Sequence, residues 1–224
     1  MVATNQTASS STTREIPIVP LENGDRLHRP EFERRYTATP HVKKAELIEG
    51  TVYVASPLRF TPHAEPHGQL LTWLGVYQAS TSACRLGIEP TVRLDNDNEP
   101  QPDIALFREG GSAAIDPDGY IAGAPELIVE IAASTTSYDL HDKKQAYERN
   151  GAKEYIVWRT LDGAIDWFIW QNGQYENLEP DEVGILKSRE FPGLWLNASA
   201  VLSGDMAAVL RSLQDGLQAR DAQL

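Results

Sequence analysis

The sequence predicts an α/β (α+β) protein, in which short strands and helices alternate before the chain ends in a β-meander and a helix. Three observations support this class: apolar runs with strand periodicity, segments with helical periodicity, and late strands separated by Asp-Gly and Asn-Gly pairs. The chain has 224 residues, 41% of them hydrophobic, which suits one domain with small appendages.

The chain is expected to divide into a leader, a main domain and a terminal helix. Its first residues are rich in Ser and Thr and lack an apolar secretory segment, so we expect a disordered leader over residues 1–25. No linker or internal repeat divides residues 26–204, which we expect to form the main domain. Val209 and Leu213 share one helical face, which predicts an amphipathic helix over residues 205–224.

The first half of the main domain is expected to form a hairpin, a helix and two strands. A Glu-Gly pair between alternating apolar runs predicts the hairpin, and the helical spacing of Leu70, Leu74 and Tyr77 predicts the helix. In chain order, these elements are expected over residues 45–55, 68–78, 88–94 and 103–107.

The second half is expected to continue with a buried strand, a helix and the meander. The run from Leu127 to Ile131 is apolar apart from Glu130, which predicts a strand that is covered on both faces. Asp139 is expected to cap the next helix and Gly151 to end it. In chain order, these elements are expected over residues 126–132, 140–150, 155–158, 164–170, 174–178 and 184–196, the last as a strand or a loop.

The composition limits which partners the protein can bind and where in the cell it can act. The net charge of -12, from 20 basic and 32 acidic residues, argues against a dedicated nucleic-acid binder with a basic face, but allows an enzyme that meets phosphates through bound cations. The single cysteine, Cys84, cannot form an internal disulfide, and no stretch is long and apolar enough to span a membrane. We therefore expect a soluble, cytoplasmic protein with no membrane contact.

Two carboxylates stand where buried strands are expected. Asp103 should lie on the strand face opposite to Ile104 and Leu106, and Glu130 interrupts an apolar run. A buried carboxylate is costly unless it is paired, hydrogen-bonded or bound to a metal. An Asp that follows a proline is commonly a strand-start residue, so the functional interpretation depends on the combination of charged residues.

The helix after Glu130 is expected to bring a lysine toward the carboxylates. Leu140 and Tyr147 mark its inner face, and Lys143 and Lys144 each lie about 50° from that line, so periodicity leaves both open. Two carboxylates and a lysine suit metal-assisted phosphodiester cleavage. The carboxylates would hold Mg²⁺ or Mn²⁺, and the lysine would orient the attacking water or stabilise the developing charge.

Several short motifs also stand in a recognisable order along the chain. They are Glu46-Leu47-Ile48-Glu49-Gly50, Pro66-His67, Pro102-Asp103, the run from Pro125 to Ile131, and Asp139-Leu140-His141-Asp142-Lys143, with Tyr147, Gly151 and Glu154-Tyr155 following. Together they resemble the Uma-type (Uma two) restriction-endonuclease family of the PD-(D/E)XK nuclease superfamily, from about Glu31 to Leu202. The resemblance implies a restriction-endonuclease-like mixed sheet flanked by helices, with a divalent metal on the two strand carboxylates.

The resemblance also implies roles for single residues. Asp103 and Glu130 match the two acidic positions. Lys143 matches the lysine, displaced from the strand position that Ala132 occupies here. Glu49 matches an early acidic position and is expected as a third metal ligand. We hold four further residues as peripheral candidates: Glu46, His67, Lys144 and Tyr147.

The function expected from these residues is that of a metal-dependent endonuclease, a phosphodiester hydrolase acting on DNA. The alternative is a catalytically inactive binding or regulatory protein with a nuclease fold, which the acidic charge and the missing strand lysine favour; hydrolysis of another phosphate ester is a third reading. The expected partners are nucleic acid, a second copy in a homodimer, and a protein that supplies DNA affinity. The sequence contains no pattern for a nucleotide cofactor.

Overall fold

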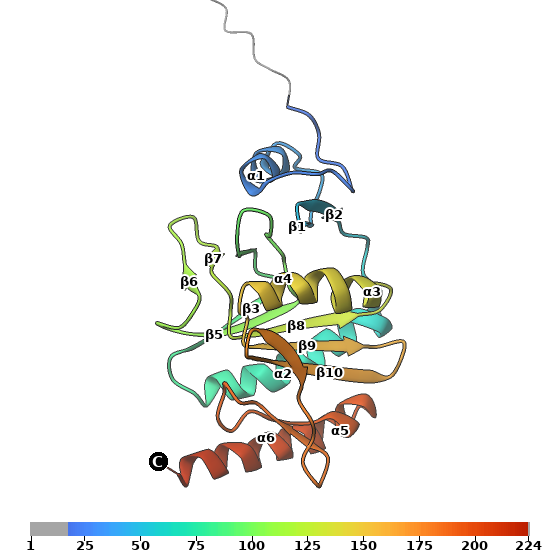
Figure 1. The fold of residues 1–224 in the computed structure, drawn as a ribbon. Helices are drawn as coiled ribbons and strands as arrows, with labels where there is room; N and C mark the ends of the chain where they lie inside the picture. The colour runs from blue at the N-terminus through green and yellow to red at the C-terminus, as the bar shows by residue number, and fades with distance from the viewer. Residues whose placement is uncertain (1–17, 224) are drawn as a thin grey trace, which may run out of the picture.

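A computed structural model describes residues 18–223, and its centre is a mixed six-stranded sheet with helices on both faces (Figure 1). The strand order is β11-β10-β9-β8-β5-β3, and the pair β8–β9 is parallel whereas the other neighbours are antiparallel. The strands are β3 (Cys84–Ile88), β5 (Ile104–Arg108), β8 (Leu127–Ala132), β9 (Glu154–Arg159), β10 (Ala164–Gln171) and β11 (Gln174–Asn177). The mixed α+β fold class expected from the sequence is confirmed.

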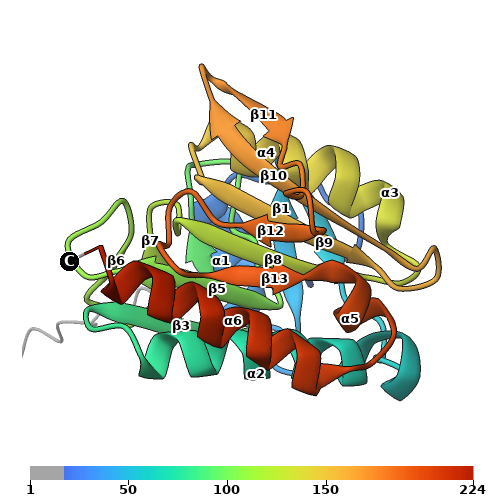
Figure 2. The same cartoon turned by 90° about the horizontal axis from the view of Figure 1, so that it is seen from below.

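Helices cover the two faces of this sheet with separate apolar cores. On one face, Leu74 of α2 (Glu65–Ala79) and Leu213 of α6 (Met206–Asp221) share a core with Leu106. On the other face, Tyr147 of α4 (Lys144–Arg149) packs against Ile128. Figures 1 and 2 show the sheet between α4 on one side and α2 with α6 on the other. β8 is therefore covered on both faces, as its apolar run predicts.

Three smaller units surround the main sheet. In the first unit, a helix packs on a hairpin, and Phe32, Leu47 and Val52 form the core between them. The second unit is a three-stranded sheet, and the third is a hairpin that α6 covers. Their elements are α1 (Arg29–Thr37), β1 (Ala45–Ile48) and β2 (Thr51–Val54); β4 (Val92–Arg93), β6 (Ala114–Ile115) and β7 (Ile121–Ala122); and β12 (Ile185–Lys187) and β13 (Trp195–Asn197), followed by α5 (Ala198–Leu202).

Three expected elements differ from the structure. The helix expected over residues 68–78 begins earlier, at Glu65, and directly follows a π-helical turn, η1 (Phe60–Ala64). The strand expected over residues 88–94 is wrong: β3 ends at Ile88 and β4 begins at Val92, because Pro90 between them cannot donate to a sheet ladder. The helix expected over residues 140–150 begins earlier, at α3 (Thr136–Tyr138), and continues through a π-helical turn, η2 (Asp139–Lys143), into α4. Asp139 is therefore an internal residue of the helical segment and not its N-cap.

The ends of the described chain are joined to the fold. Residues 1–17, most of the expected leader, lie outside the described residues. Leu21 is buried beneath the β1–β2 hairpin, and the Gly24 amide donates to the Val52 carbonyl at 2.8 Å. Ordered contacts therefore begin before residue 26, whereas the domain limits stay a prediction. In the part of the chain that the structure covers, no helix has the length and hydrophobicity needed to cross a membrane.

The α6 helix lies against the β13 strand at two glycines, which leads to a prediction about packing. A Cβ at Gly216 would lie 2.4 Å from the Gly193 carbonyl and 2.7 Å from the Trp195 ring. Gly216→Ala should therefore lower the free energy of unfolding by about 1–3 kcal/mol. Gly75→Ala in α2 is the matched control, since its Cβ meets nothing within 4 Å and alanine should stabilise the helix by about 0.5–1 kcal/mol. If urea denaturation shows the same change in the free energy of unfolding for Gly216→Ala and Gly75→Ala, the close packing at Gly216 is contradicted.

Four carboxylates surround the Arg93 guanidinium where α1, β4 and the β6–β7 loop meet. Arg93 lies 2.9 Å from Glu33, 2.6 Å from Asp116, 2.7 Å from Asp118 and 4.0 Å from Glu99. Burial, and then the hydrogen bond and charge of Glu33, raise the pKa of Glu99 to about 8. Glu99 is thus a carboxyl group that the fold keeps protonated near neutral pH.

This raised pKa makes stability depend on pH with a defined sign. The unfolded chain releases the Glu99 proton near its ordinary pKa of 4.5, whereas the folded chain retains it to about pH 8. The free energy of unfolding should fall between these two pH values, by roughly 2 kcal/mol allowing for solvent screening. In urea denaturation at pH 5 and pH 8.5, Glu99→Gln should lose less stability with rising pH than the wild type does, and the difference is the Glu99 contribution. The exposed Glu176→Gln is the control. If stability falls with pH as steeply in Glu99→Gln as in this control, the raised pKa of Glu99 is refuted.

Candidate active site

Two adjacent strands place Asp103 and Glu130 opposite each other. In the antiparallel β5–β8 pair, Ile104 is paired with Val129. The next position along this register sets Asp103 opposite Glu130, and directly opposed residues have their Cβ atoms about 5 Å apart. Both side chains are buried. The pairing of β5 with β8 therefore brings two carboxylates that are distant in sequence to one point of the sheet.

Asp103 is held by one backbone amide and faces a histidine and a lysine. Its Oδ2 atom accepts a hydrogen bond from the Ile131 amide at 2.7 Å. Its Oδ1 atom lies 3.3 Å from His63 Nε2 and 3.9 Å from Lys44 Nζ. Burial alone would raise the pKa of Asp103, but His63, Lys44 and the Ile131 amide together hold it below its usual value. The side chain is thus an oriented carboxylate anion.

Glu130 is oriented by two donors from the helical segment that follows β8. Its Oε1 atom accepts hydrogen bonds from Lys143 Nζ at 2.9 Å and from the Tyr147 hydroxyl at 3.0 Å. Burial raises the pKa of Glu130 well above its ordinary value; Lys143 opposes this shift, and the neighbouring acidic groups add to it. The carboxyl group therefore lies in a place where a further positive charge would stabilise its ionised form.

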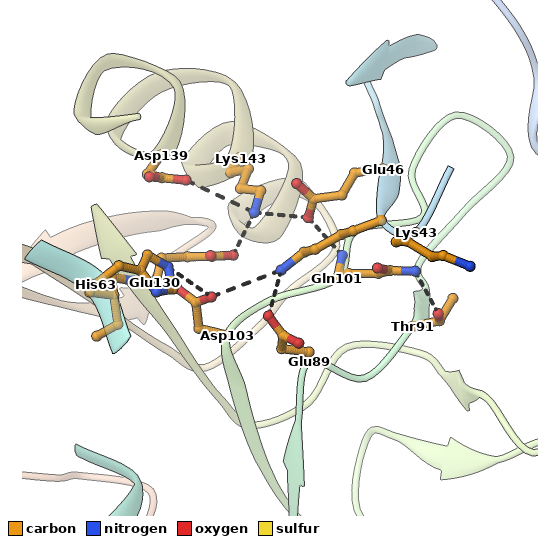
Figure 3. A network of polar contacts seen from close by, with 12 residues as sticks. Lys43, Glu46, His63, Glu89, Thr91, Gln101, Asp103, Glu130, Asp139 and Lys143 are labelled. Atoms are coloured by element: carbon orange, nitrogen blue, oxygen red, sulfur yellow. Dashed lines mark hydrogen bonds and ion pairs between the residues drawn. The ribbon is translucent and has the colours of Figure 1, made fainter. Parts of the chain in front are cut away.

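Lys143 lies at the centre of the acidic groups (Figure 3). Besides Glu130, its ammonium contacts Glu46 at 2.8 Å and Asp139 at 3.9 Å. Burial alone would lower the pKa of Lys143, but these carboxylates raise it well above its usual value. Lys143 comes from η2, and a π-helical turn contains more residues per turn than an α-helix. Residues 139, 143 and 147 thereby come to lie on one inward face.

The buried charges of this cluster do not balance. The buried acids are Asp103, Glu130, Glu46 and Asp139, whereas Lys143 is the buried lysine among them. Burial raises the pKa of Asp139 to about 6 against the charge of Lys143. An excess of buried carboxylates is costly unless a cation neutralises it. The donor set of oxygen atoms suits a divalent ion.

The structure brings together most of the residues expected at the site. Asp103, Glu130 and Lys143 converge, and two of the peripheral candidates, Glu46 and Tyr147, contact them directly. Glu46 is held in turn by the Gln101 amide, which donates to its Oε1 atom at 2.7 Å.

The remaining expected residues have other positions. Glu49, expected as a metal ligand, lies at the tip of the β1–β2 turn with φ of 50° and pairs with Arg149 at 2.8 Å. It lies beyond the strand end, where it no longer follows the alternation that points Glu46 inward. Lys144 lies over the Phe168 ring, with Nζ 3.8 Å from the ring centroid. His67 lies beside His63 at the edge of the cluster, with their ring centroids 5.9 Å apart.

Three residues of this site were not expected from the sequence. Asp139 was assigned as a helix cap, although its spacing of four from Lys143 is that of neighbours on a helix face. His63 lies in the π-helical turn η1, outside every helix expected from the sequence, and it too lies four residues before a second histidine. Lys44 lies just before β1 and is half-buried beside Asp103. A spacing of four residues was therefore the sequence signal that could have identified both Asp139 and His63. It was missed because both helices begin earlier in the structure than the sequence predicts.

Two comparisons with known proteins find similar sequences or structures. A family model described as Uma2, "Putative restriction endonuclease", matches residues 29–199. A solved structure from Anabaena variabilis, described as a "putative nuclease belonging to DUF820", is similar with a TM-score of 0.56 and 17% identity. The similarity covers 71% of this chain and 89% of that one, and at this identity it concerns the fold. No curated protein matches the chain.

Proposed function

We propose that this chain, which belongs to the Uma2 family, is a metal-dependent endonuclease that hydrolyses phosphodiester bonds in DNA. One observation carries the proposal: Asp103, which immediately precedes β5, faces Glu130 of the adjacent β8 at the next position of their register, and Lys143 is bound to Glu130. The family description and the nuclease described for Anabaena variabilis support the same reaction class.

Asp103 and Glu130 would hold the divalent ion, Mg²⁺ or Mn²⁺. The hydrogen bonds from Lys143 and Tyr147 both end on Oε1 of Glu130, which leaves Oε2 to face an ion. Carboxylate oxygens are the ligands that both ions prefer, and the excess of buried negative charge favours a cation here. When bound, such an ion neutralises the phosphate and lowers the pKa of the attacking water.

The side chains around this position orient the reacting groups. The Lys143 ammonium stabilises negative charge that develops on the phosphate oxygens as water adds. Glu46 also binds the Lys143 ammonium, and the Gln101 backbone amide restrains Glu46. Tyr147 fixes the orientation of Glu130. A preorganised arrangement of this kind loses little free energy to reorganisation during the reaction.

The charge of the whole chain suggests how DNA would reach the site. With a net charge of -12, a single copy would attract a polyanion weakly. We therefore propose that the chain acts in the cytoplasm as a homodimer, or with a protein partner that supplies a basic surface. Light scattering after size-exclusion chromatography, with and without DNA, distinguishes these two states.

Cleavage assays on the purified chain test the proposed function. Supercoiled DNA, single-stranded DNA and RNA would each be incubated with Mg²⁺, Mn²⁺ or a chelator. We expect metal-dependent nicking of DNA, and a loss of rate by about a hundredfold or more in Glu130→Gln. Glu176→Gln, an exposed change on β11, should retain the rate.

Two outcomes would contradict the proposal. Absence of turnover with every ion, in a folded wild type, would identify a non-catalytic binding or regulatory protein with a nuclease fold. Hydrolysis confined to small phosphate esters would retain the reaction class but exclude the DNA substrate.

A further inference from the structure

Two histidines lie next to Asp103. His63 belongs to the π-helical turn η1 (Phe60–Ala64), and His67 lies in the first turn of α2, which continues from it. Residues four apart on a continuous helical segment share one face and can act together on one ligand. The helical segment thus presents two imidazole rings toward the end of β5, where Asp103 stands.

The three side chains have the spacing of metal ligands. One donor atom each from His63, His67 and Asp103 lie within 4.8 Å of one another. His63 Nε2 is 3.3 Å from Asp103 Oδ1, and the two rings stand at 90° to each other. Ligands bound at about 2.0–2.2 Å around one ion lie about 3–4 Å apart, so small side-chain rotations would close this group on an ion.

Unpartnered nitrogen atoms point to a ligand at this position. His63 is 9% exposed, and its Nδ1 atom is buried without a hydrogen-bond partner among the described residues. The Nε2 atom of His67 is also buried and has no hydrogen-bond partner among the described residues. Buried polar atoms usually have a partner, and each exception calls for an explanation. A neutral imidazole can present its free nitrogen to a metal ion.

We propose that His63, His67 and Asp103 form a binding site for a divalent transition-metal ion of the Zn²⁺, Co²⁺ or Mn²⁺ class. Two imidazoles and one carboxylate leave coordination positions open, and imidazole nitrogen selects transition metals over Mg²⁺. Lys44 Nζ, 3.9 Å from Asp103 Oδ1, is the positive group that a bound ion would have to displace. The proposal goes beyond nuclease activity, because it adds two histidine donors to Asp103, which the two sites share, and its test requires no turnover.

Cobalt spectroscopy on the full chain tests this site without an activity assay. Co²⁺ is titrated into wild-type protein while the visible absorption of the protein-bound ion is recorded. We expect saturable binding of one Co²⁺ that Zn²⁺ displaces and excess Mg²⁺ does not. His67→Ala should weaken the affinity at least tenfold, whereas the exposed His41→Ala should leave it unchanged. Far-UV circular dichroism verifies that each variant is folded.

A second variant separates ligation from a structural role. His67→Cys should restore binding and add a thiolate-to-cobalt charge-transfer band, which a merely structural residue would not produce. Absence of a bound-cobalt spectrum in the wild type, or unchanged affinity in His67→Ala, would overturn the site. If the protein cleaves DNA with a metal ion but shows no Co²⁺ binding of this kind, the proposed function holds and the histidine site is excluded. If the protein binds Co²⁺ at the histidines but does not cleave DNA, the histidine site holds and the proposed function is excluded.

Discussion

Lys143→Met is expected to lower the free energy of unfolding by about 3–5 kcal/mol. The Lys143 ammonium is 3% exposed and bonded to two buried carboxylates, Glu46 and Glu130. Methionine has a similar length but no charge, so both acids would lose their cation inside the protein. They would have to bind protons or remain ionised without a partner, and both outcomes are costly. Urea denaturation followed by circular dichroism measures the loss.

The neighbouring lysine provides a matched control for this substitution. Lys144→Met removes the same charge one residue later, where the ammonium lies over the Phe168 ring, and should cost about 1 kcal/mol or less. Adding Glu130→Gln to Lys143→Met should recover part of the stability, because one unpaired acid disappears. Equal losses in the two single variants would show that the buried ion pairs contribute little to folding.

Asp103→Asn is expected to reduce the rate of DNA cleavage by about a thousandfold or more. The substitution removes one of the two carboxylates that would hold the ion, while the asparagine oxygen can still accept the Ile131 amide. The fold should therefore survive the loss of the charge. The same variant should weaken Co²⁺ binding, because Asp103 also contributes to the histidine site. Single-turnover cleavage assays and the cobalt titration measure the two effects on one preparation.

An acidic residue outside the cluster is the control for Asp103→Asn. Asp142 is exposed and accepts a hydrogen bond from the Tyr53 hydroxyl at 3.1 Å. Asp142→Asn should keep both the cleavage rate and the Co²⁺ affinity. Wild-type cleavage by a folded Asp103→Asn protein would place the reaction at another part of the molecule.

The sequence predicts those parts of the fold that depend on local periodicity. β8 and the meander follow from apolar runs and from Gly163 and Gly173, whose positive φ angles permit the tight turns. The break at Pro90 and the two-residue strands of the small sheet leave little periodic signal. The early start of the helix at Thr136 was missed because a π-helical turn changes the spacing on which helix prediction depends.

The site was predictable in its residue types and only partly in its geometry. An acidic residue inside an apolar strand is an unfavourable placement without a function, which singles out Glu130 from sequence alone. That Asp103 stands opposite it depends on the register of β5 with β8, which no local pattern contains. Glu46 and Glu49 carry the same charge three residues apart, and the position of the hairpin turn directs Glu46 inward and Glu49 to the surface.

The parallel pairing of β8 and β9 has a consequence for the order of folding. The helical crossover that joins these strands carries Lys143. The ion pair between Lys143 and Glu130 therefore links residues that are close together in the sequence. Glu46 and His63 come from segments far earlier in the chain, and such contacts form later because they close longer loops. A nascent crossover would thus already hold Lys143 with two acids, Glu130 and Asp139. Docking of the earlier segments then adds Glu46 beside Lys143, so the last step of folding completes the acidic cluster.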